Sequence, residues 1–367
     1  MRFPMFAPLA RVTSAFACAL SAGALLSACG GSDSSSSAGD AAAVNRPAPP
    51  KSMFPSPEGK SLAEVVKDTS GPAEVVVSPA AMVFYKGENR YPFGVFHNDR
   101  SQISDAKVAL YISKAPPPKL KLEGPAAETK KQRKGAIARA RHEALEAPAV
   151  GPFPASVETL ETQPAFRAQT TANDAGAATA VYSTKIDFPS DGEWRVAAVI
   201  EEEDGKFTGA ILPSAVVGEF NEIPRVGDQA PVIHTPTAAD ANGDLSTITT
   251  RIPPDTQNKV DFADVVGREP IALLFATPQF CQSRVCGPVV DVAEQLKETW
   301  GDRVNFIHME IYNDNDPNKG VRPQVRAYHL PSEPWLFVID KNGKIAGEVE
   351  GAFGIDLMTR ELEKVAE

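Results

Sequence analysis

The sequence has few cysteines, no excess of positive charge and none of several common catalytic motifs. Four cysteines in 367 residues are too few for a small scaffold held together by disulfides. The chain carries 37 basic and 47 acidic residues, and a net charge of −10 argues against nucleic acid as a partner, because phosphate binding needs a positive surface. The sequence contains no G-x-S-x-G, H-E-x-x-H, P-loop or dinucleotide-binding motif, and we expect no cofactor.

The remaining composition is that of a globular chain with much connecting loop. Hydrophobic residues make up 43%, which argues against a wholly disordered chain. The 32 prolines indicate that part of the length is linker or loop. A domain usually takes ~100–200 residues, so we expect two folded domains with appendages.

The N-terminus has the pattern of a cleaved signal with a lipid anchor. A basic start precedes an apolar run at 15–26, which is too short to span a bilayer comfortably. The run ends in Leu-Ser-Ala-Cys-Gly, which resembles the lipobox of bacterial lipoproteins. The resemblance implies a signal peptide at 1–28, cleavage after it, and diacylation of Cys29. Two acyl chains suffice for stable anchoring, so we expect an extracytoplasmic protein held at the cell membrane or the outer membrane.

The residues that follow Cys29 are expected to form a flexible tether over 29–72. The alternative is an ordinary secretory signal in which Cys29 only happens to lie near the cleavage site. Cys18 lies within the apolar run and leaves with the signal peptide. Cys281 and Cys286 are then the cysteines of the folded body, in an oxidising compartment where a pair can form a disulfide.

Residues 73–220 contain several short β-rich runs, which indicate an antiparallel β-sandwich. The segment 188–196, Phe-Pro-Ser-Asp-Gly-Glu-Trp-Arg-Val, is similar to a strand corner of bacterial immunoglobulin-like extracytoplasmic modules. This resemblance implies an immunoglobulin-like sandwich, with Trp194 in its core. Residues 114–170 are predicted to be a Pro-rich insertion that carries a basic cluster. The cluster is interpreted either as a surface for anionic lipid or polymer, or as an ordinary solvated insertion.

Residues 221–367 alternate strand and helix patterns, as in an α/β domain. Several features coincide with the thioredoxin-like fold, which this part of the chain resembles. A buried apolar strand precedes Cys281, a helix carries Pro288 seven residues later, and Pro334 heads the next central strand. The resemblance implies a thioredoxin-like domain in which the Pro334 peptide bond is cis. The complete fold prediction is an all-β sandwich followed by an α/β thioredoxin-like domain.

The cysteine spacing departs from the Cys-x-x-Cys of thioredoxins. Residues five apart within one helix are ~8–9 Å apart, whereas a disulfide needs Cα atoms within ~7 Å. Cys281 must therefore lie in the loop before the helix if it bonds to Cys286. The resemblance implies Cys281 as the attacking thiol at a helix N-terminus, Cys286 as the resolving thiol and Pro334 beside them. The strand at 271–275 lacks the buried acid that thioredoxins keep there, so a purely structural disulfide stays open.

Two further functions remain open. Sco-type copper chaperones share the thioredoxin-like fold and use a cysteine pair with a distant histidine. His308, Met309 and His329 are candidate extra ligands, and His329 is the better one because it lies near the Pro334 loop. A non-catalytic binding module is the other alternative. Our main prediction is a membrane-anchored thiol–disulfide oxidoreductase, with envelope proteins that carry thiols or disulfides as its partners.

Overall fold

The computed structural model describes residues 44–69, 71, 75–117, 130–202, 204–281 and 283–366, with the backbone alone at 130–133. All of these residues belong to one compact unit, Ala42–Glu367. The predicted signal peptide 1–28 and lipidated Cys29 lie outside the described residues. In the described part of the chain, no helix has both the length and the apolar character needed to cross a bilayer.

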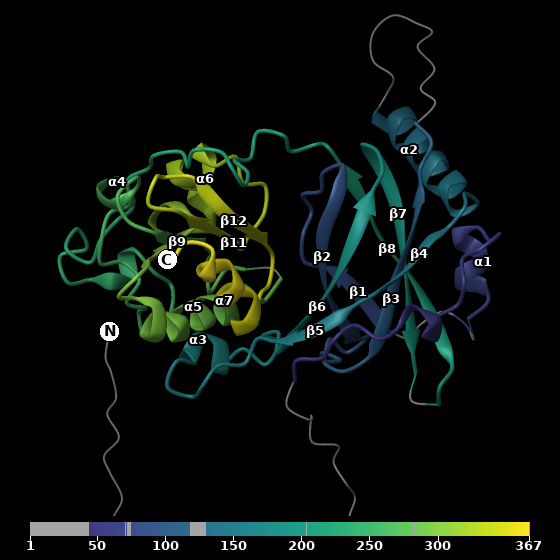
Figure 1. Ribbon diagram of the computed structural model, residues 1–367, viewed down its shortest axis with the longest axis horizontal. Helices are drawn as coiled ribbons and strands as arrows, with labels where there is room; N and C mark the ends of the chain where they lie inside the picture. Colours follow the sequence, from purple (N-terminus) through teal and green to yellow (C-terminus); the bar gives the residue numbers. More distant parts are fainter. Residues whose placement is uncertain are drawn as a thin grey trace, which may run out of the picture. The chain divides into compact units, whose positions relative to one another are not determined.

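The described residues form three four-stranded sheets with few helices (Figure 1). The first sheet has the order β1 (Val75–Pro79), β2 (Gly87–His97), β6 (Ala180–Phe188), β5 (Ser156–Thr159). The second has the order β4 (Val150–Pro154), β3 (Lys107–Lys114), β7 (Gly192–Glu201), β8 (Phe207–Val217). The third has the order β10 (Asn305–Met309), β9 (Ile271–Phe275), β11 (Trp335–Ile339), β12 (Ile345–Glu350). The helices are α1 (Leu62–Lys67), α2 (Lys130–Leu145), α3 (Gln169–Ala172), α4 (Phe262–Val265), α5 (Cys286–Trp300), α6 (Pro323–Ala327) and α7 (Ile355–Glu363).

The first two sheets are antiparallel throughout and share one hydrophobic core. Alternation along the strands decides which side chains enter it: in β6, Lys185 and Asp187 are exposed, whereas Ile186 and Phe188 are buried. Trp194 is 4% exposed, and its ring centroid lies 5.8 Å from that of Phe188. The prediction that Trp194 is a core residue is confirmed.

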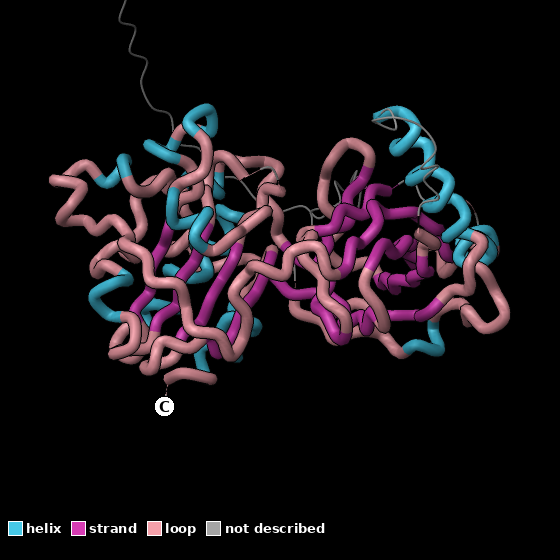
Figure 2. The backbone as a smooth tube through the Cα atoms, turned by 90° about the horizontal axis from the view of Figure 1, so that it is seen from above, coloured by secondary structure: helices cyan, strands magenta, loops and turns pink. Residues whose placement is uncertain are grey.

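The predicted insertion at 114–170 differs from the structure. Strands β4 and β5 lie within that range, and they complete the second and first sheets respectively. The sequence did not predict β4 as a strand because it contains prolines, which cannot donate a ladder hydrogen bond and are uncommon inside strands. The predicted basic helix does form as α2, which contacts β3 and β7 (Figure 2). The hydroxyl of Ser113 donates to the carbonyl of Ala144 at its end, 2.6 Å away.

The described part of the predicted tether packs against the second sheet. Leu62 and Val65 of α1 are fully buried, and they join a core cluster with Tyr111 and Val199. A capping box starts α1: the Ser61 hydroxyl accepts from the backbone N–H of Glu64, and the Glu64 carboxylate accepts from that of Ser61. Two apolar side chains one helical turn apart bind this segment to the sheet. The Ala/Pro-rich composition of the segment had suggested a linker instead.

The third sheet has apolar side chains on both faces, as the uninterrupted run Ile271–Phe275 predicts. Strand β10 runs parallel to β9, and β11 runs antiparallel to both β9 and β12. One face packs with α5 and α7, and the other packs with α4 and α6. A mixed sheet with helices on both faces agrees with the α/β pattern predicted for 221–367.

Polar contacts join β12 and the residues after it to β2 and the loop that precedes β2. The Glu350 carboxylate accepts from the backbone N–H groups of Met82 and Val83, at 3.0 and 2.9 Å. The Arg90 guanidinium donates to the carbonyl of Ala352, 2.6 Å away. Gly351 has a φ of +79°, and a Cβ there would lie 2.2 Å from the carbonyl oxygen of Ala80. Only glycine fits this close approach without movement of the backbone.

Candidate functional site

Cys281 and Cys286 form a disulfide, with their Cα atoms 5.9 Å apart. Cys281 lies in the loop after β9, and Cys286 is the first residue of α5. The chain turns back between them at Arg284, which has a φ of +58° and whose N–H donates to the carbonyl of Cys281, 3.3 Å away. The prediction that the first cysteine precedes the helix and that the loop winds back is confirmed.

The prediction that Cys281 lies at the helix N-terminus is wrong. Helix α5 begins at Cys286, so the positive end of the helix lies at the second sulfur and favours the Cys286 thiolate as a leaving group. Cys286 is fully buried, whereas Cys281 is only partly buried. Cys281 therefore keeps some surface in solvent that an incoming polypeptide can contact, whereas Cys286 has none.

Glu333 brings a carboxylate to the disulfide. A carboxylate oxygen of Glu333 and the two cysteine sulfurs all lie within 4.8 Å of one another. The peptide bond between Glu333 and Pro334 is cis, as the resemblance implies, and Pro334 directly precedes β11. Among the described residues, the Oε2 atom of Glu333 is buried and has no hydrogen-bond partner. A buried acceptor of this kind is free to take a proton or a ligand.

The surroundings of Glu333 favour its protonated form. Burial, together with the nearby Glu310 carboxylate, raises the pKa of Glu333 to about 8, and a backbone hydrogen bond from Thr277 opposes the increase. Glu310 is itself fully buried, and one of its oxygens accepts from the N–H of Thr250, 2.6 Å away. The acid that lies beside the disulfide therefore has a pKa close to that of an ordinary thiol.

Sequence reasoning missed Glu333. The sequence prediction considered an acid only in β9, where thioredoxins keep one, and β9 contains none. The acid comes instead from the loop before β11, at the residue that precedes Pro334. Its position next to the expected cis-proline, which the resemblance already placed beside the cysteines, is the signal that could have found it.

The candidate copper ligands are not brought together with the cysteines. His308 is fully buried, and both ring nitrogens are engaged: Nδ1 lies 2.9 Å from the Asp255 carboxylate and Nε2 lies 3.1 Å from the carbonyl of Ala276. Burial opposes the charge on His308, but Asp255 outweighs it and raises the pKa of His308 to about 9. His329 is exposed, with Nδ1 3.4 Å from a carboxylate oxygen of Glu222.

Within the described residues, the cluster that could hold a metal consists of Cys281, Cys286 and Glu333. Neither His308 nor His329 belongs to it. In the disulfide the two sulfurs are bonded to each other, and a metal needs thiolates. The geometry therefore favours chemistry of the sulfur–sulfur bond over metal delivery.

Comparison with known proteins finds only weak structural similarity. No protein-family model matches the chain, and no curated protein matches it. One similar solved structure is a candidate thiol:disulfide interchange protein DsbE from Chlorobium tepidum, 16% identical, covering 38% of this chain and 96% of that one with a TM-score of 0.27. Another is the PmoD soluble domain from Methylocystis sp., 13% identical, covering 39% and 90% with a TM-score of 0.17. The strand order, the disulfide position and the cis-proline carry the assignment instead. The C-terminal part of the chain shares these three features with the thioredoxin-like fold.

Proposed function

We propose that this chain is an extracytoplasmic thiol–disulfide exchange protein that acts on envelope proteins through Cys281 and Cys286. The observation that carries the proposal is the unequal pair: an accessible Cys281 sulfur bonded to a buried Cys286 sulfur, with the Glu333 carboxylate beside both. A purely structural disulfide needs neither an accessible sulfur nor an acid next to it.

The exchange proceeds through one mixed disulfide. In the reduced protein, the Cys281 thiolate attacks one sulfur of a partner disulfide, and the other partner sulfur leaves as a thiolate. The Cys286 thiolate then attacks the Cys281 sulfur, which re-forms the internal disulfide and releases the second partner thiolate. Two electrons pass from this chain to the partner. The same steps in reverse deliver a disulfide to a partner dithiol.

Glu333 acts as the proton acceptor for Cys286. The buried Cys286 thiol must lose its proton before it attacks, and water does not reach it. An ordinary thiol has a pKa of about 8.5, so transfer to a carboxylate with a pKa of about 8 costs little free energy. In the reverse direction, the protonated Glu333 gives its proton to the leaving Cys286 thiolate. Pro334 directly follows this acid in the chain, and the peptide bond between the two is cis.

The wider architecture is part of the proposal. Residues 73–220 would form an immunoglobulin-like module and residues 221–367 the thioredoxin-like domain, supported by two antiparallel sheets with a common core and by a separate mixed sheet. Acylated Cys29 would hold the protein at the membrane, supported by the lipobox-like sequence.

A trapping experiment tests the exchange function. In a Cys286→Ser variant the second step cannot occur, so the variant should accumulate mixed disulfides through Cys281 that a reductant dissolves. The matched control is the Cys281→Ser/Cys286→Ser double variant, which should trap nothing. The internal disulfide should also have a reduction potential above about −300 mV. If Cys286→Ser captures no partner and the potential lies below that value, the disulfide is structural.

A further inference from the structure

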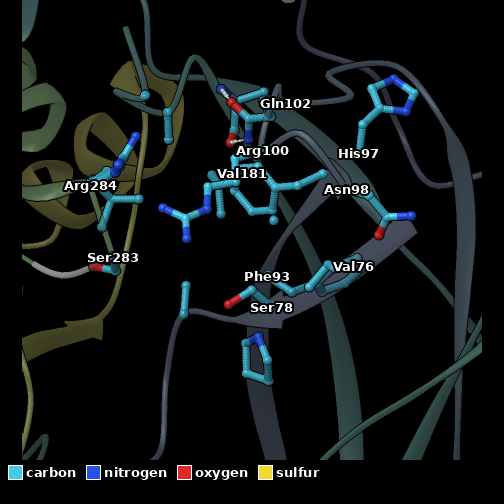
Figure 3. Close-up of a pocket in the computed structure, with 18 residues that line it drawn as sticks. Val76, Ser78, Phe93, His97, Asn98, Arg100, Gln102, Val181, Ser283 and Arg284 are labelled. Carbon is cyan, nitrogen blue, oxygen red and sulfur yellow. Dashed lines mark hydrogen bonds between the residues drawn. The ribbon is translucent and has the colours of Figure 1, made fainter. Parts of the chain in front are cut away.

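A cavity of about 440 Å³ opens beside the cysteine loop. One side includes residues from β1, β2 and the turn after β2, together with residues at 176–181, and the other includes Ser283, Arg284 and Val285 from the loop between the two cysteines. Figure 3 shows Ser283 and Arg284 on one side, with Val76 and Phe93 across from them. The volume lies in the range of sites that bind small molecules or short peptide segments.

The cavity adjoins the disulfide directly. The Ser283 hydroxyl lines it and also lies 3.2 Å from the Cys281 sulfur. The Arg284 carbonyl accepts from the N–H of Ala178 on the neighbouring wall, 3.1 Å away, which fixes the loop to that wall. A peptide residue bound in the cavity therefore lies next to, or one residue away from, the partner residue that contacts the Cys281 sulfur.

The lining combines apolar surface with positive charge. Its apolar part includes the buried Phe93 and Val181 together with Phe96, whose ring lies over Gly94. Its charged part consists of the exposed Arg100 and Arg284, and none of the described residues that line it is acidic. This local excess of positive charge is unusual in a chain with a net charge of −10.

Both arginines have an unusual backbone conformation, and Gly176 makes room for the side chain of Arg284. Arg100 and Arg284 both have positive φ, at +77° and +58°, a conformation that is uncommon for residues other than glycine. Gly176 leaves room for Arg284, because a Cβ at 176 would lie 1.3 Å from a guanidinium nitrogen. The nearest acidic group to Arg284 is the exposed Asp174, at 3.8 Å, which leaves most of the guanidinium donors free. Among the described residues, Arg100 forms no ion pair.

We propose that this cavity binds an acidic segment of the partner polypeptide, next to the partner cysteine that exchanges with Cys281. This inference rests on the proposed exchange function and names the class of substrate. Carboxylates of the segment bind the guanidinium groups of Arg100 and Arg284, and its apolar side chains cover Phe93 and Val181. Charge-assisted hydrogen bonds to arginine orient the segment as well as hold it, which presents the partner sulfur to Cys281.

The test compares two disulfide-linked peptides that differ only in aspartates or asparagines beside the cysteine. The reduced full chain should react at least about tenfold faster with the acidic peptide at low salt, and the preference should shrink at high salt. The Arg100→Gln/Arg284→Gln double variant should lose the preference. Gly176→Val, which displaces Arg284 without removing a charge, should reduce it. Arg303→Gln, an exposed arginine outside the cavity, should keep it.

A small uncharged disulfide, 2,2′-dithiodipyridine, separates this proposal from the exchange function. If wild type reacts with it but treats the two peptides alike, the docking proposal is overturned and exchange stands. If wild type fails to react with it, the exchange function fails. Peptide binding to the oxidised chain then tests the cavity alone, and equal binding of the acidic and neutral peptides overturns it. Full competition by free citrate, with no extra affinity for the peptide, would make the cavity a small-anion site and also overturn the proposal.

Discussion

Replacement of Glu333 by glutamine should stabilise the protein at high pH and not at low pH. In the folded chain the pKa of Glu333 is about 8, against 4.5 for an ordinary glutamate. The folded state therefore keeps a proton that the unfolded state has lost between these two values, and the free energy of unfolding falls as the pH rises through this window. Glutamine cannot ionise, so the free energy of unfolding of the variant does not fall with pH for this reason.

The size of the effect follows from the pKa difference. At 1.36 kcal/mol per pH unit, an increase from 4.5 to about 8 corresponds to at most about 5 kcal/mol above pH 8. Glu333 keeps part of its surface in solvent, which screens the charge, so we expect about 2–4 kcal/mol. Below pH 4.5 both states are protonated, and the variant should match wild type apart from a small constant difference.

Urea unfolding of the oxidised protein from pH 4 to pH 9 measures this difference. Glu348→Gln is the matched control, because burial also raises the pKa of Glu348, to about 7, while this residue faces Arg225. Relative to wild type, both variants should become more stable as the pH rises. Only Glu333→Gln should slow the second step of exchange, by a factor of about 10²–10⁴ if Glu333 accepts the Cys286 proton.

Two results would refute this reasoning. A stability gain from Glu333→Gln that is the same at pH 5 and pH 9 would mean that the folded carboxyl group is not protonated in this range. An unchanged rate of disulfide re-formation in the same variant would remove Glu333 from the proton transfer, whatever its pKa.

Two other predictions concern stability and anchoring. Asp291→Asn should destabilise the chain by about 3–5 kcal/mol in urea unfolding, because it leaves the buried Arg251 guanidinium, 2.9 Å from the Asp291 carboxylate, without its counter-charge. The exposed pair of Glu88 and Lys185 is the control, and Glu88→Gln should cost less than about 1 kcal/mol; equal losses would contradict the buried-pair argument. Cys29→Ala should move the protein from the membrane fraction to the soluble fraction, and a variant that stays with the membrane would refute the lipid anchor.

The amino-acid sequence by itself indicated the antiparallel strands other than β4 and β5, the buried strand β9 and the nearness of Cys281 to Cys286. The strands follow from the periodicity of apolar residues over short segments. The nearness of the two cysteines follows from the short distance that five residues of chain can span. Both can be recognised from residues that are close in sequence. The sequence also contained Pro334, whose expected cis bond the structure has.

Only the tertiary structure decided where β4 and β5 pair, where α5 begins, and which acid faces the disulfide. Glu333 lies 47 residues beyond Cys286, and Arg100 lies more than 180 residues before Arg284. No local pattern relates such positions, because their contact follows from how whole sheets and loops pack. The chemistry of this site therefore comes from residues that the fold brings together over long stretches of chain.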